Sequence, residues 1–515
     1  MKKQADQFKK IVAHCKEYGY IFPSSEIYDG LSASYDYGPY GVELKNNIKN
    51  YWWKAMVQMH DNIVGLDAAI FMHPKVWKAS GHVDAFNDPM IDNKDSKKRY
   101  RADNLIEDYM GKIDAKIQKE VDKAKKRFGD AFDEEEFKAT NPRVKNNVEK
   151  RTALSKRYVL ALENNNLEEL KTIIEECGIA DPETGSKNWT EVRQFNLMFS
   201  MQFGALASDA ENSKVYLRPE TAQGIFVNFL NVQKSTRQKL PFGIAQIGKA
   251  FRNEIVARQF IFRMREFEQM EMQFFVKPGA EMEWYEYWKN FRMKWHETIF
   301  PANKLKFHNH EKLAHYANAA VDIEFEFPFG FKELEGIHSR TDFDLSSHEK
   351  HSGKKLQYFD PELNKNYVPF VVETSIGLDR MFLAIFSNSL VEETLEDGST
   401  RTVLRLPYFL APVKAAILPL LKKDGLPEVA RKIVDDLKFE YNVQYDEKDA
   451  IGKRYRRQDA AGTPICITVD HDSLTDDSVT IRHRDSMQQE RVAISKLKEI
   501  LGGLVKMESY LKKLN

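Results

Sequence analysis

The stretch KAFRNEIVARQFIFRMREFEQMEMQFFV, residues 249–276, holds the densest chemical signal in the chain. Its second half alternates between apolar and polar residues, which predicts a β-strand with two different faces. The apolar face would carry Met270, Met272, Phe274 and Val276, and the other face Phe267, Gln269, Glu271 and Gln273. The first face fits a protein core. The second combines an aromatic ring with carboxylate and amide groups, which indicates a ligand.

The same stretch also contains several cations, enough to hold a polyanion such as a nucleotide triphosphate. These cations are Arg252, Arg258, Arg263 and Arg265. Glu254 lies among them. A charged hairpin held by cross-strand ion pairs therefore explains any single arginine or glutamate equally well.

A second segment, FVVETSIGLDRMFLAIF at residues 370–386, predicts a strand, a turn at Gly377 and a helix. The buried stripe of that helix would be Leu378, Met381, Phe382 and Ile385. Arg380 falls in the first helical turn, where a cation opposes the helix dipole, so an anion is expected nearby. Gly377 would allow close backbone approach at a helix N-terminus, which suits a phosphate. The alternative is an ordinary strand-to-helix junction with a solvent-exposed arginine.

Outward from these segments, hydrophobic periodicity predicts the remaining elements. Residues 43–59 repeat apolar side chains at helical spacing, and residues 66–74 (LDAAIFMHP) predict a short strand ended by proline. Residues 103–175 are rich in lysine and glutamate and predict a helical insertion. Residues 321–327 (VDIEFEF) alternate as an antiparallel strand with one solvated face does.

The C-terminal part of the chain differs in pattern. An acidic, polar segment, EETLEDGST at 392–400, predicts a domain border. Beyond Leu406 short apolar strands alternate with helices, including the basic segment IGKRYRRQDA at 451–460. This order indicates a compact α/β domain of about 110 residues.

Composition bounds the class of protein. A chain of 515 residues predicts two to four domains. Its 77 basic and 77 acidic residues cancel, which argues against a globally basic nucleic-acid coat. Three cysteines are too few for a disulfide framework or a four-cysteine metal site. No apolar run reaches the length of a signal peptide or a membrane span, so we expect a cytoplasmic protein without a membrane partner.

Several motifs resemble one enzyme family. FRNE followed by RMREF is similar to motif 2 of the class II aminoacyl-tRNA synthetases, GLDR to their motif 3, and residues 43–59 to the dimer-forming motif 1. Within that class the chain resembles the homodimeric type of glycyl-tRNA synthetase. The segments that carry this resemblance are SYDYGPYGVELKNN (34–47), HPKVWKASGH (73–82), RQFNLMF (193–199), RPETAQG (218–224), EFEQME (266–271) and ELEGIHSRTDFDL (333–345).

The resemblance implies an α+β catalytic core, an antiparallel sheet flanked by helices, with a helical insertion and a C-terminal α/β anticodon-binding domain. The expected boundaries are 1–102 for the first part of the core, 103–188 for the insertion, 189–404 for the core with motifs 2 and 3, and 405–515 for the anticodon-binding domain. The implied reaction is ATP-dependent attachment of glycine to tRNA(Gly) through a glycyl-adenylate, releasing AMP and pyrophosphate. A homodimer is expected.

The resemblance also implies an ATP site. Arg252 would contact the α-phosphate, Arg380 the γ-phosphate, and these two would be the catalytic residues. Glu333 and Glu373 are the candidates for holding Mg²⁺. The whole predicted ATP site is Arg252, Asn253, Glu254, Phe262, Arg263, Met264, Arg265, Glu266, Phe267, Glu333, Leu334, Gly377, Leu378, Asp379 and Arg380.

For glycine, the resemblance implies that carboxylates hold the ammonium group and crowd Cα, so that alanine is excluded sterically. The predicted glycine site is Arg101, Glu220, Phe267, Glu268, Gln269, Met270, Glu271, Arg340, Glu373, Thr374, Ser375, Ile376 and Gly377. The predicted tRNA-binding cations are Lys453, Arg454, Arg456 and Arg457. Many relatives carry paired cysteines near the insertion, whereas this chain has Cys177 alone there, so no zinc is expected.

Two other classes of protein are weighed against this interpretation. A noncatalytic binding protein on the same scaffold would have lost the ATP residues, yet Arg252, Glu254, Phe267 and Arg380 are present. A small-molecule ligase that forms an adenylate without using tRNA would lack the basic C-terminal domain. Charging of tRNA transcripts with each amino acid in turn separates the three.

Overall fold

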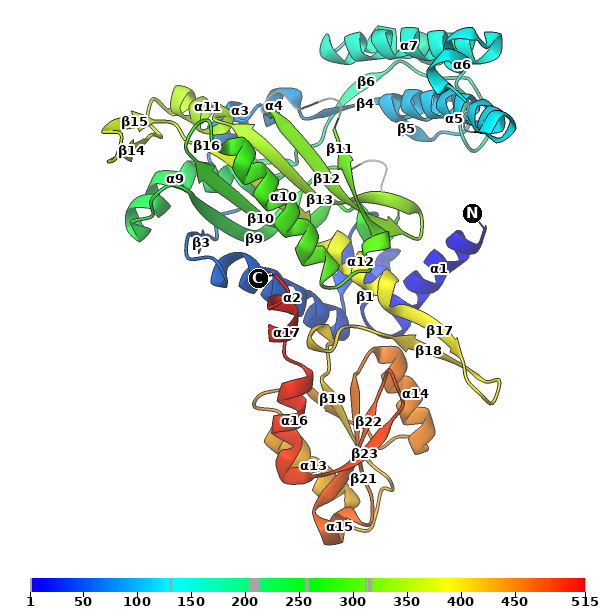
Figure 1. Ribbon diagram of the computed structural model, residues 1–515, viewed down its shortest axis with the longest axis vertical. Coiled ribbons are helices and arrows are strands. Elements are labelled where there is room, and N and C mark those ends of the chain that lie inside the picture. The colour runs from blue at the N-terminus through cyan, green and yellow to red at the C-terminus, as the bar shows by residue number, and fades with distance from the viewer. Residues whose placement is uncertain are drawn as a thin grey trace. The chain divides into compact units, whose positions relative to one another are not determined.

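The computed structural model describes residues 2–514 except 130–131, 203–213, 255–258, 311–312 and 314–316. The chain divides into two compact units, each described separately below (Figure 1). The first comprises Met1–Ser80, Phe199–Arg252 and Ala257–Asn515, and the second Gly81–Met198 and Asn253–Val256.

Seven strands among the described residues form the main sheet of the first unit, in the order β11-β12-β13-β16-β10-β9-β3. Their bounds are β3 Ile63–Gly65, β9 Phe242–Phe251, β10 Glu266–Val276, β11 Leu305–Asn309, β12 Ala319–Phe327, β13 Gly330–Thr341 and β16 Phe370–Gly377. All neighbours pair antiparallel except β3 and β9. The mainly antiparallel sheet confirms the predicted core architecture.

The two faces of β10 separate as the alternation predicts. Met270, Met272, Phe274 and Val276 are fully buried in the largest hydrophobic cluster. We call this side of the sheet the core face. Helix α10 (Glu281–Glu297) packs across β12, β13 and β16 and adds Trp288 and Trp295 to the same cluster (Figure 1).

The opposite side, on which Gln269, Glu271 and Gln273 lie, is called the site face. Toward one end it turns apolar, because Phe275 of β10 packs there against Phe226 and Phe229 of helix α9 (Ala222–Thr236). The site face is therefore closed by α9 at that end and polar along the remaining length of the strands.

The helix predicted over residues 43–59 is confirmed as α2 (Pro39–Trp53), continued by a π-helical turn at Lys54–Gln58. Its apolar side is buried in the core of its own chain. The strand predicted over residues 66–74 is wrong. The strand there is β3, three residues earlier, and Pro74 begins helix α3 (Pro74–Ala79), since proline suits the first position of a helix.

The other helices of this part are α1 (Lys2–Glu17), α11 (Phe343–Ser352) and α12 (Leu378–Ser389). Leu378, Met381, Phe382 and Ile385 of α12 are buried, which confirms the predicted stripe. Two-stranded pairs complete it: β1 (Ile21–Pro23) with β2 (Tyr35–Tyr37), β7 (Ser200–Gln202) with β8 (Lys214–Tyr216), and β14 (Tyr358–Asp360) with β15 (Lys365–Tyr367).

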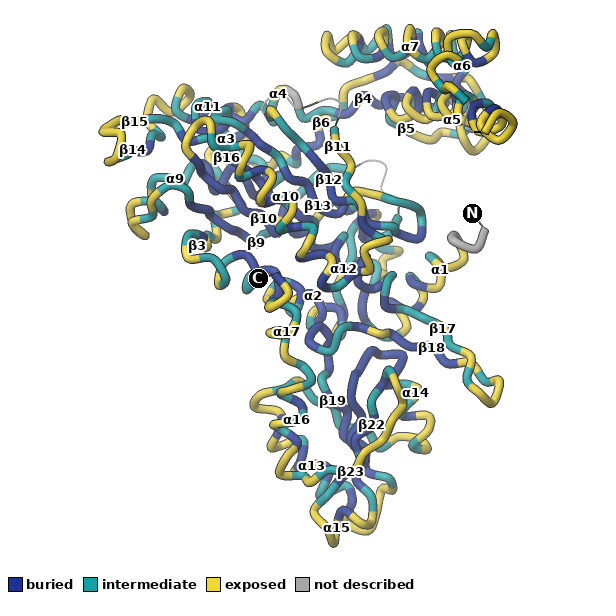
Figure 2. The backbone as a smooth tube through the Cα atoms, in the orientation of Figure 1, coloured by how far each residue is buried: buried dark blue, intermediate teal, exposed yellow. Residues whose placement is uncertain are grey.

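The acidic segment at 392–400 lies in a hairpin of β17 (Leu390–Thr394) and β18 (Thr400–Leu404). A five-stranded sheet follows within the described residues, in the order β20-β19-β21-β22-β23. Its strands are β19 (Ala415–Pro419), β20 (Val443–Tyr445), β21 (Ile465–Val469), β22 (Ser478–His483) and β23 (Gln489–Ala493). Its helices are α13 (Leu426–Leu437), α14 (Ile451–Ala461), α15 (Ser473–Asp476), α16 (Leu497–Leu504) and α17 (Glu508–Leu511). Figure 2 shows that the residues of the central strands of both sheets are buried.

The second unit is mainly helical, as predicted. Its helices are α4 (His82–Ala85), α5 (Ala102–Phe128), α6 (Glu134–Thr140), α7 (Pro142–Glu163) and α8 (Leu167–Glu176). A small sheet joins β4 (Asn87–Asp92), β5 (Arg99–Arg101) and β6 (Arg193–Asn196). The unit has its own hydrophobic core, in which Ile106, Ile173 and Ile174 are buried. None of the helices in the described part of the chain is both long and apolar enough to cross a bilayer.

Candidate active site

Three neighbouring strands bring polar residues together on the site face. The register pairs Glu271 of β10 with Ser375 of β16, and Gln273 with Glu373. On the other side of β16, His338 of β13 pairs with Glu373. Strand alternation then directs these side chains to one side of the sheet. Residues more than 100 positions apart thus share one surface.

Glu271 is the most deeply buried carboxylate on this surface. It is 2% exposed, and it accepts hydrogen bonds from the Thr221 hydroxyl and, at 2.7 Å, from Gln273 Nε2. Burial raises the pKa of Glu271 well above its usual value, and the negative charges of Glu373 and Glu220 raise it further. A buried carboxylate with acidic neighbours favours a cation beside it.

Glu373, by contrast, is already paired with Arg340 and His338. Arg340 Nη1 donates to Oε2 at 2.9 Å, His338 Nδ1 lies 2.9 Å from Oε1, and Gln273 Nε2 donates to Oε2 at 2.6 Å. Burial opposes ionisation, but Arg340 and His338 outweigh it and lower the pKa of Glu373. Arg340 is itself held by Asp344 of α11, at 2.8 and 3.1 Å.

The segment before α9, residues 218–221, crosses the site face and is fixed there by hydrogen bonds. Arg218 is 2% exposed and donates to the carbonyl oxygens of Lys249, at 2.6 Å, and Ala68, at 2.8 Å. A Cβ on Gly248 would lie 2.2 Å from Arg218 Nη2, so only glycine fits there. The backbone N–H of Thr221 donates to Gln269 Oε1 at 3.1 Å.

Gln223 of α9 links this segment to the acidic residues of the site by hydrogen bonds. Its Nε2 donates to Glu220 and Asp344, at 2.9 Å each, and its Oε1 lies 2.8 Å from His348 Nε2. Several residues that orient the site were not among the predicted site residues: Arg218, Thr221, Gln223 and Asp344, together with His338, which the sequence suggests only as a structural or hydrogen-bonding histidine. The segments RPETAQG and ELEGIHSRTDFDL contained them, but without three-dimensional pairing nothing distinguished them from their neighbours.

Two arginines of the predicted ATP site each lie against an aromatic ring. The Arg252 guanidinium carbon is 5.3 Å from the centre of the Phe267 ring, and its Nε donates to the Pro219 carbonyl at 3.1 Å. Arg380 lies 4.4 Å from the ring centre of Phe262. The structure thus supplies two cation–aromatic pairs, a combination that suits a phosphate beside a base.

Arg380 also has an anionic partner. Its Nη1 lies 3.0 Å from Glu333 Oε2. The Arg380 charge is the main cause of a lowered pKa for Glu333. The anion predicted near the first turn of α12 is therefore supplied, in this state of the chain, by a carboxylate that is half exposed.

Four predicted glycine-site residues do not lie on the site face. Met270, Thr374 and Ile376 point to the core face, where Met270 and Ile376 belong to the main hydrophobic cluster. Glu268 points the same way and pairs with Lys45 at 2.6 Å and Lys49 at 2.7 Å. Adjacent residues of a strand face opposite sides of the sheet, so these four side chains lie on the other side from Glu271 and Glu373.

Three predicted ATP-site residues are likewise directed elsewhere. Leu334 and Leu378 are buried in the main hydrophobic cluster. Asp379 is 2% exposed, 3.1 Å from Lys45 Nζ, and accepts the backbone N–H of Glu268 at 2.8 Å. A register shift between Ile323 and Glu324 of β12 sets both Leu334 and Glu335 into the core.

The connection into β10 carries the remaining predicted ATP residues. Met264 and Glu266 line a cavity of about 450 Å³ with Lys45, Lys249 and Phe267. Glu266 is ion-paired with Lys249, and the Arg265 side chain donates to the Ser32 carbonyl at 3.3 Å. Arg263 directly follows the short helical turn Phe260–Phe262, and Gly377 ends β16 opposite Gln269.

Arg101, Asn253 and Glu254 lie in the second unit. Arg101 is ion-paired with Asp88 at 2.9 Å and with Asp103 at 2.6 Å. Burial opposes its charge, but the hydrogen bond and charge of Asp103 outweigh burial and raise its pKa. The backbone N–H of Asn253 donates to the Leu197 carbonyl at 2.8 Å within the same unit.

The two candidates for Mg²⁺ are not brought together. Glu373 pairs with His338 across the sheet, whereas Glu333 lies five residues earlier on β13, opposite Glu324. At roughly 3.3 Å per residue the two are too far apart to share one ion. Among the described residues, no three His, Cys, Asp or Glu side chains are grouped to hold a metal.

The predicted tRNA-binding cations of α14 differ in their surroundings. Lys453 is exposed, and Arg456 donates to the Thr400 carbonyl at 2.9 Å. Arg457 pairs with Asp446 at 2.9 Å. Arg454 is 2% exposed and donates to the carbonyl oxygens of Pro419 and Leu420, at 2.7 and 3.1 Å. The Arg454 side chain is therefore bound inside the domain, unlike the exposed Lys453.

Family descriptions match most of the chain. "Glycyl-tRNA synthetase insertion domain 1" matches residues 88–197, "tRNA synthetase class II core domain (G, H, P, S and T)" residues 202–389, and "Anticodon binding domain" residues 414–504. The three matches follow one another along the chain in the order of the helical unit, the main sheet and the C-terminal sheet.

Individual relatives agree with these matches. The chain is 53% identical over 494 residues to a "Glycine--tRNA ligase" of Chlorobaculum tepidum, covering 96% of this chain and 98% of that one. It is 51% identical over 499 residues to a "Glycine--tRNA ligase" of Macrococcus caseolyticus, with the same coverage. The solved structure of Giardia lamblia prolyl-tRNA synthetase in complex with prolyl-adenylate is similar with a TM-score of 0.57 at 14% identity, covering 100% of this chain and 81% of that one. At that identity the last similarity concerns the fold alone.

Proposed function

The chain belongs to the glycine--tRNA ligase family of the class II aminoacyl-tRNA synthetases, and we propose that it activates glycine on the site face of β10, β13 and β16. It attaches glycine to tRNA and uses ATP to do so. The observation that carries the proposed location is the burial of Glu271 beside Glu373 and Glu220, whose negative charges raise its pKa, while neighbouring Glu373 is ion-paired with Arg340 at 2.9 Å.

Glu271 and Glu220 receive the ammonium group of glycine. An ammonium in contact with Glu271 places a positive charge directly on this buried carboxylate, which opposes the unfavourable effect of burial. The Thr221 hydroxyl and Gln273 amide already hold the carboxylate in one orientation. Ser375, opposite Glu271 in the register, lies beside this position. Because carboxylates crowd the place of Cα, a methyl group is excluded sterically.

ATP lies along the strand ends, with Arg252 on the α-phosphate and Arg380 on the γ-phosphate. Phe267 offers a ring surface for the adenine, with the Arg252 guanidinium on it at 5.3 Å. Because Glu333 is half exposed, Arg380 can exchange its ion pair with Glu333 for one with phosphate.

The reaction follows from positioning and charge neutralisation. The glycine carboxylate attacks the α-phosphorus, pyrophosphate leaves, and the terminal ribose hydroxyl of tRNA(Gly) then attacks the glycyl-adenylate and releases AMP. Arg252 and Arg380 stabilise the negative charge of the transferring phosphoryl group. Neither step requires a nucleophilic side chain of the protein.

Mg²⁺ accompanies the ATP phosphates in this proposal, and of the two candidates only Glu333 fits it. Its carboxylate is half exposed beside Arg380. Glu373 does not fit, because Arg340, His338 and Gln273 occupy its oxygen atoms. A bound Mg²⁺ would neutralise phosphate charge, and no step above depends on it.

No zinc is proposed for the second unit. Two turns of that unit are joined by hydrogen bonds instead, since Asp181, 2% exposed, accepts from Ser96 Oγ at 2.6 Å and from Tyr100 Oη at 2.8 Å. The backbone N–H groups of Glu183 and Thr184 also donate hydrogen bonds to the Asp181 carboxylate, at 2.8 and 3.3 Å. The carboxylate performs the cross-linking that a metal would otherwise perform.

We also propose a homodimer in the cytoplasm. The support is the resemblance of α2 to motif 1. The apolar side of α2 is already buried in its own chain, so a partner subunit would contact other residues of this region.

The test is charging of a tRNA(Gly) transcript with ATP and each amino acid in turn. Glycine alone should be attached, and alanine should give no product above background. Attachment of another amino acid, or adenylate formation without transfer to tRNA, would refute the proposed specificity.

A further inference from the structure

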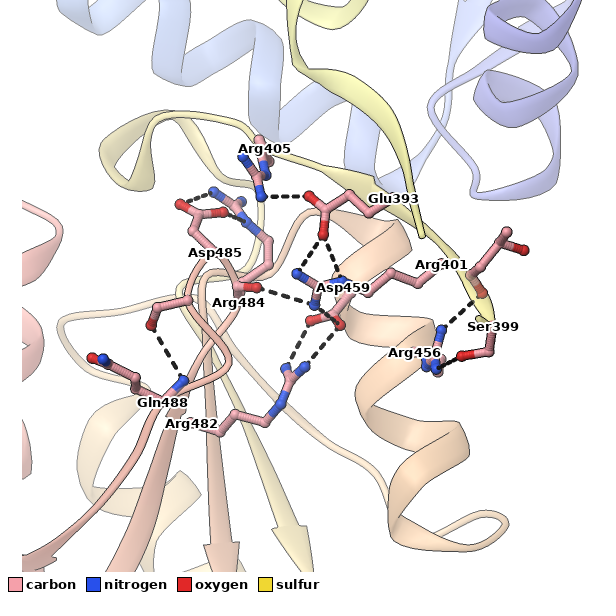
Figure 3. A network of polar contacts seen from close by, with 12 residues as sticks. Glu393, Ser399, Arg401, Arg405, Arg456, Asp459, Arg482, Arg484, Asp485 and Gln488 are labelled. Carbon is pink, nitrogen blue, oxygen red and sulfur yellow. Dashed lines mark hydrogen bonds and ion pairs between the residues drawn. The ribbon is translucent and has the colours of Figure 1, made fainter. Parts of the chain in front are cut away.

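Helix α14, which carries the predicted tRNA-binding cations, is fixed to the catalytic part of the same unit by buried polar contacts. Asp459 is fully buried near the end of this helix. Arg401 of β18 donates to Asp459 Oδ2 at 2.9 Å through Nη1. Arg482 of β22 donates to both oxygens of Asp459, at 2.8 and 3.0 Å. One carboxylate therefore joins the hairpin to the C-terminal sheet (Figure 3).

Arg401 is the residue that crosses between the two parts. Its side chain is 2% exposed, and besides Asp459 it binds Glu393 of β17 at 2.8 Å and the Arg484 carbonyl at 3.2 Å. Glu393 is in turn paired with Arg405 (Figure 3). Arg401 belongs to the hairpin that directly follows α12, the helix whose first turn holds Arg380.

The C-terminal end of α14 is held as well, and again by the catalytic part. His14 Nε2 of α1 lies 2.8 Å from the Ala460 carbonyl, and Tyr20 Oη donates to the Ala461 carbonyl at 2.8 Å. Such carbonyls lack partners within a helix and need them from elsewhere. Arg456 of α14 donates back to the hairpin, to the Thr400 carbonyl at 2.9 Å.

We propose that Arg401 is a positioning residue for tRNA charging, because through Asp459 it sets the direction of α14 and so the place where the tRNA anticodon arm is held. The inference rests on the proposed tRNA contact of α14. It assigns Arg401 no contact with glycine, ATP or tRNA. A buried ion pair contributes little net stability but strongly restricts geometry, which suits such a role.

The test compares Arg401→Met with the matched control Arg482→Met. Each variant removes one of the two arginines that are ion-paired with Asp459 and leaves the other, so the buried Asp459 carboxylate keeps one cationic partner. Arg401→Met removes the ion pair between the hairpin and Asp459 of α14, whereas Arg482→Met leaves it in place. KM and kcat are measured for full-length tRNA(Gly) and for a minihelix of its acceptor arm, together with glycine-dependent ATP–pyrophosphate exchange and the melting temperature.

Arg401→Met should raise KM for full-length tRNA by about 10- to 100-fold, the effect expected of a misplaced binding surface. Pyrophosphate exchange and minihelix charging should stay within about twofold of wild type. Arg482→Met should keep the wild-type KM for tRNA. Arg401→Lys, which can retain one ion pair with Asp459, should recover part of the loss, and it carries the same comparison if the methionine variant does not fold.

Three results would overturn the proposal. One is an unchanged KM for tRNA in Arg401→Met. Another is an equal loss in Arg482→Met, and the third is a parallel fall of all three activities with the melting temperature, since that describes a residue needed only for folding. Wild-type protein that exchanges pyrophosphate but charges no tRNA would instead refute the proposed function, so the two failures are distinguishable.

Discussion

Glu271 on β10 and Glu373 on β16 share one amide group, since Gln273 Nε2 donates to Glu271 Oε1 at 2.7 Å and to Glu373 Oε2 at 2.6 Å. Of the two, Glu373 is the one that is ion-paired with a buried arginine, Arg340 at 2.9 Å. The two carboxylates therefore have opposite pKa shifts, raised for Glu271 and lowered for Glu373. This asymmetry is the basis for assigning the substrate ammonium to Glu271.

Glu268 and Glu271 lie on opposite faces of β10, so substitution of Glu268 should affect stability rather than glycine binding. Glu268→Gln should lower the melting temperature, because it removes a carboxylate paired with Lys45 and Lys49 on the core face. KM for glycine should stay within about twofold of wild type, since this side chain does not reach the site face. A large rise in KM for glycine without loss of thermal stability would contradict this structural role and indicate that Glu268 contacts glycine.

Arg252 should be indispensable for adenylate formation. Arg252→Ala should lower glycine-dependent pyrophosphate exchange by at least about 100-fold, because a guanidinium facing the transferring phosphoryl group is lost. Lys234→Ala, which removes an exposed cation from α9, is the control and should exchange normally. Near-normal exchange by Arg252→Ala, with intact folding, would refute its assignment to the α-phosphate.

The pair of His338 and Glu373 predicts a pH-dependent stability. Burial opposes protonation of His338, but the hydrogen bond and charge of Glu373 outweigh it and raise the His338 pKa. Its stabilising effect is thus complete below the ordinary histidine pKa of about 6.5 and is lost as the pH rises through the higher folded value. The lowered pKa of Glu373 keeps the carboxylate ionised through this range.

His338→Gln should therefore reduce the melting temperature most between about pH 5 and 6.5, and less at higher pH. Melting curves of both proteins across pH 5 to 9 measure the difference. A difference that grows with rising pH would contradict a protonated His338 in the folded protein.

Gly248 should tolerate no side chain. A methyl group there would meet Arg218 Nη2 at 2.2 Å and displace the arginine that holds the Lys249 and Ala68 carbonyls. Gly248→Ala should lower both stability and pyrophosphate exchange. Gly111→Ala in α5 is the matched control, because a Cβ there meets nothing within 4 Å and alanine favours a helix by about 1 kcal/mol. Equal behaviour of the two variants would contradict the close approach at Gly248.

Local patterns in the sequence predicted much of the fold. Alternation in residues 266–276 assigned Met270 and Glu271 to opposite faces, and helical spacing located α2 and α12. The strand at 66–74 failed because an apolar run before a proline also describes an irregular segment leading into a helix whose first residue is that proline.

The site was harder to predict, because it depends on pairing between distant strands. Motif resemblance selected contiguous residues such as Glu268 to Glu271, whereas the sheet exposes only every second one on the site face. Arg454 illustrates the same limit in α14, where four cations within five residues looked alike until Arg454 was found bound to the carbonyls of Pro419 and Leu420. Which cation is buried depends on tertiary packing.

The most direct test of the proposed glycine site is the pair of Michaelis constants of Glu271→Gln in ATP–pyrophosphate exchange. If Glu271 holds the ammonium group, the variant loses a charged hydrogen bond, and KM for glycine should rise by about 10- to 100-fold. KM for ATP should change by no more than about threefold. An equal rise of both constants, or an unchanged KM for glycine, would contradict the assignment of the ammonium group to this carboxylate.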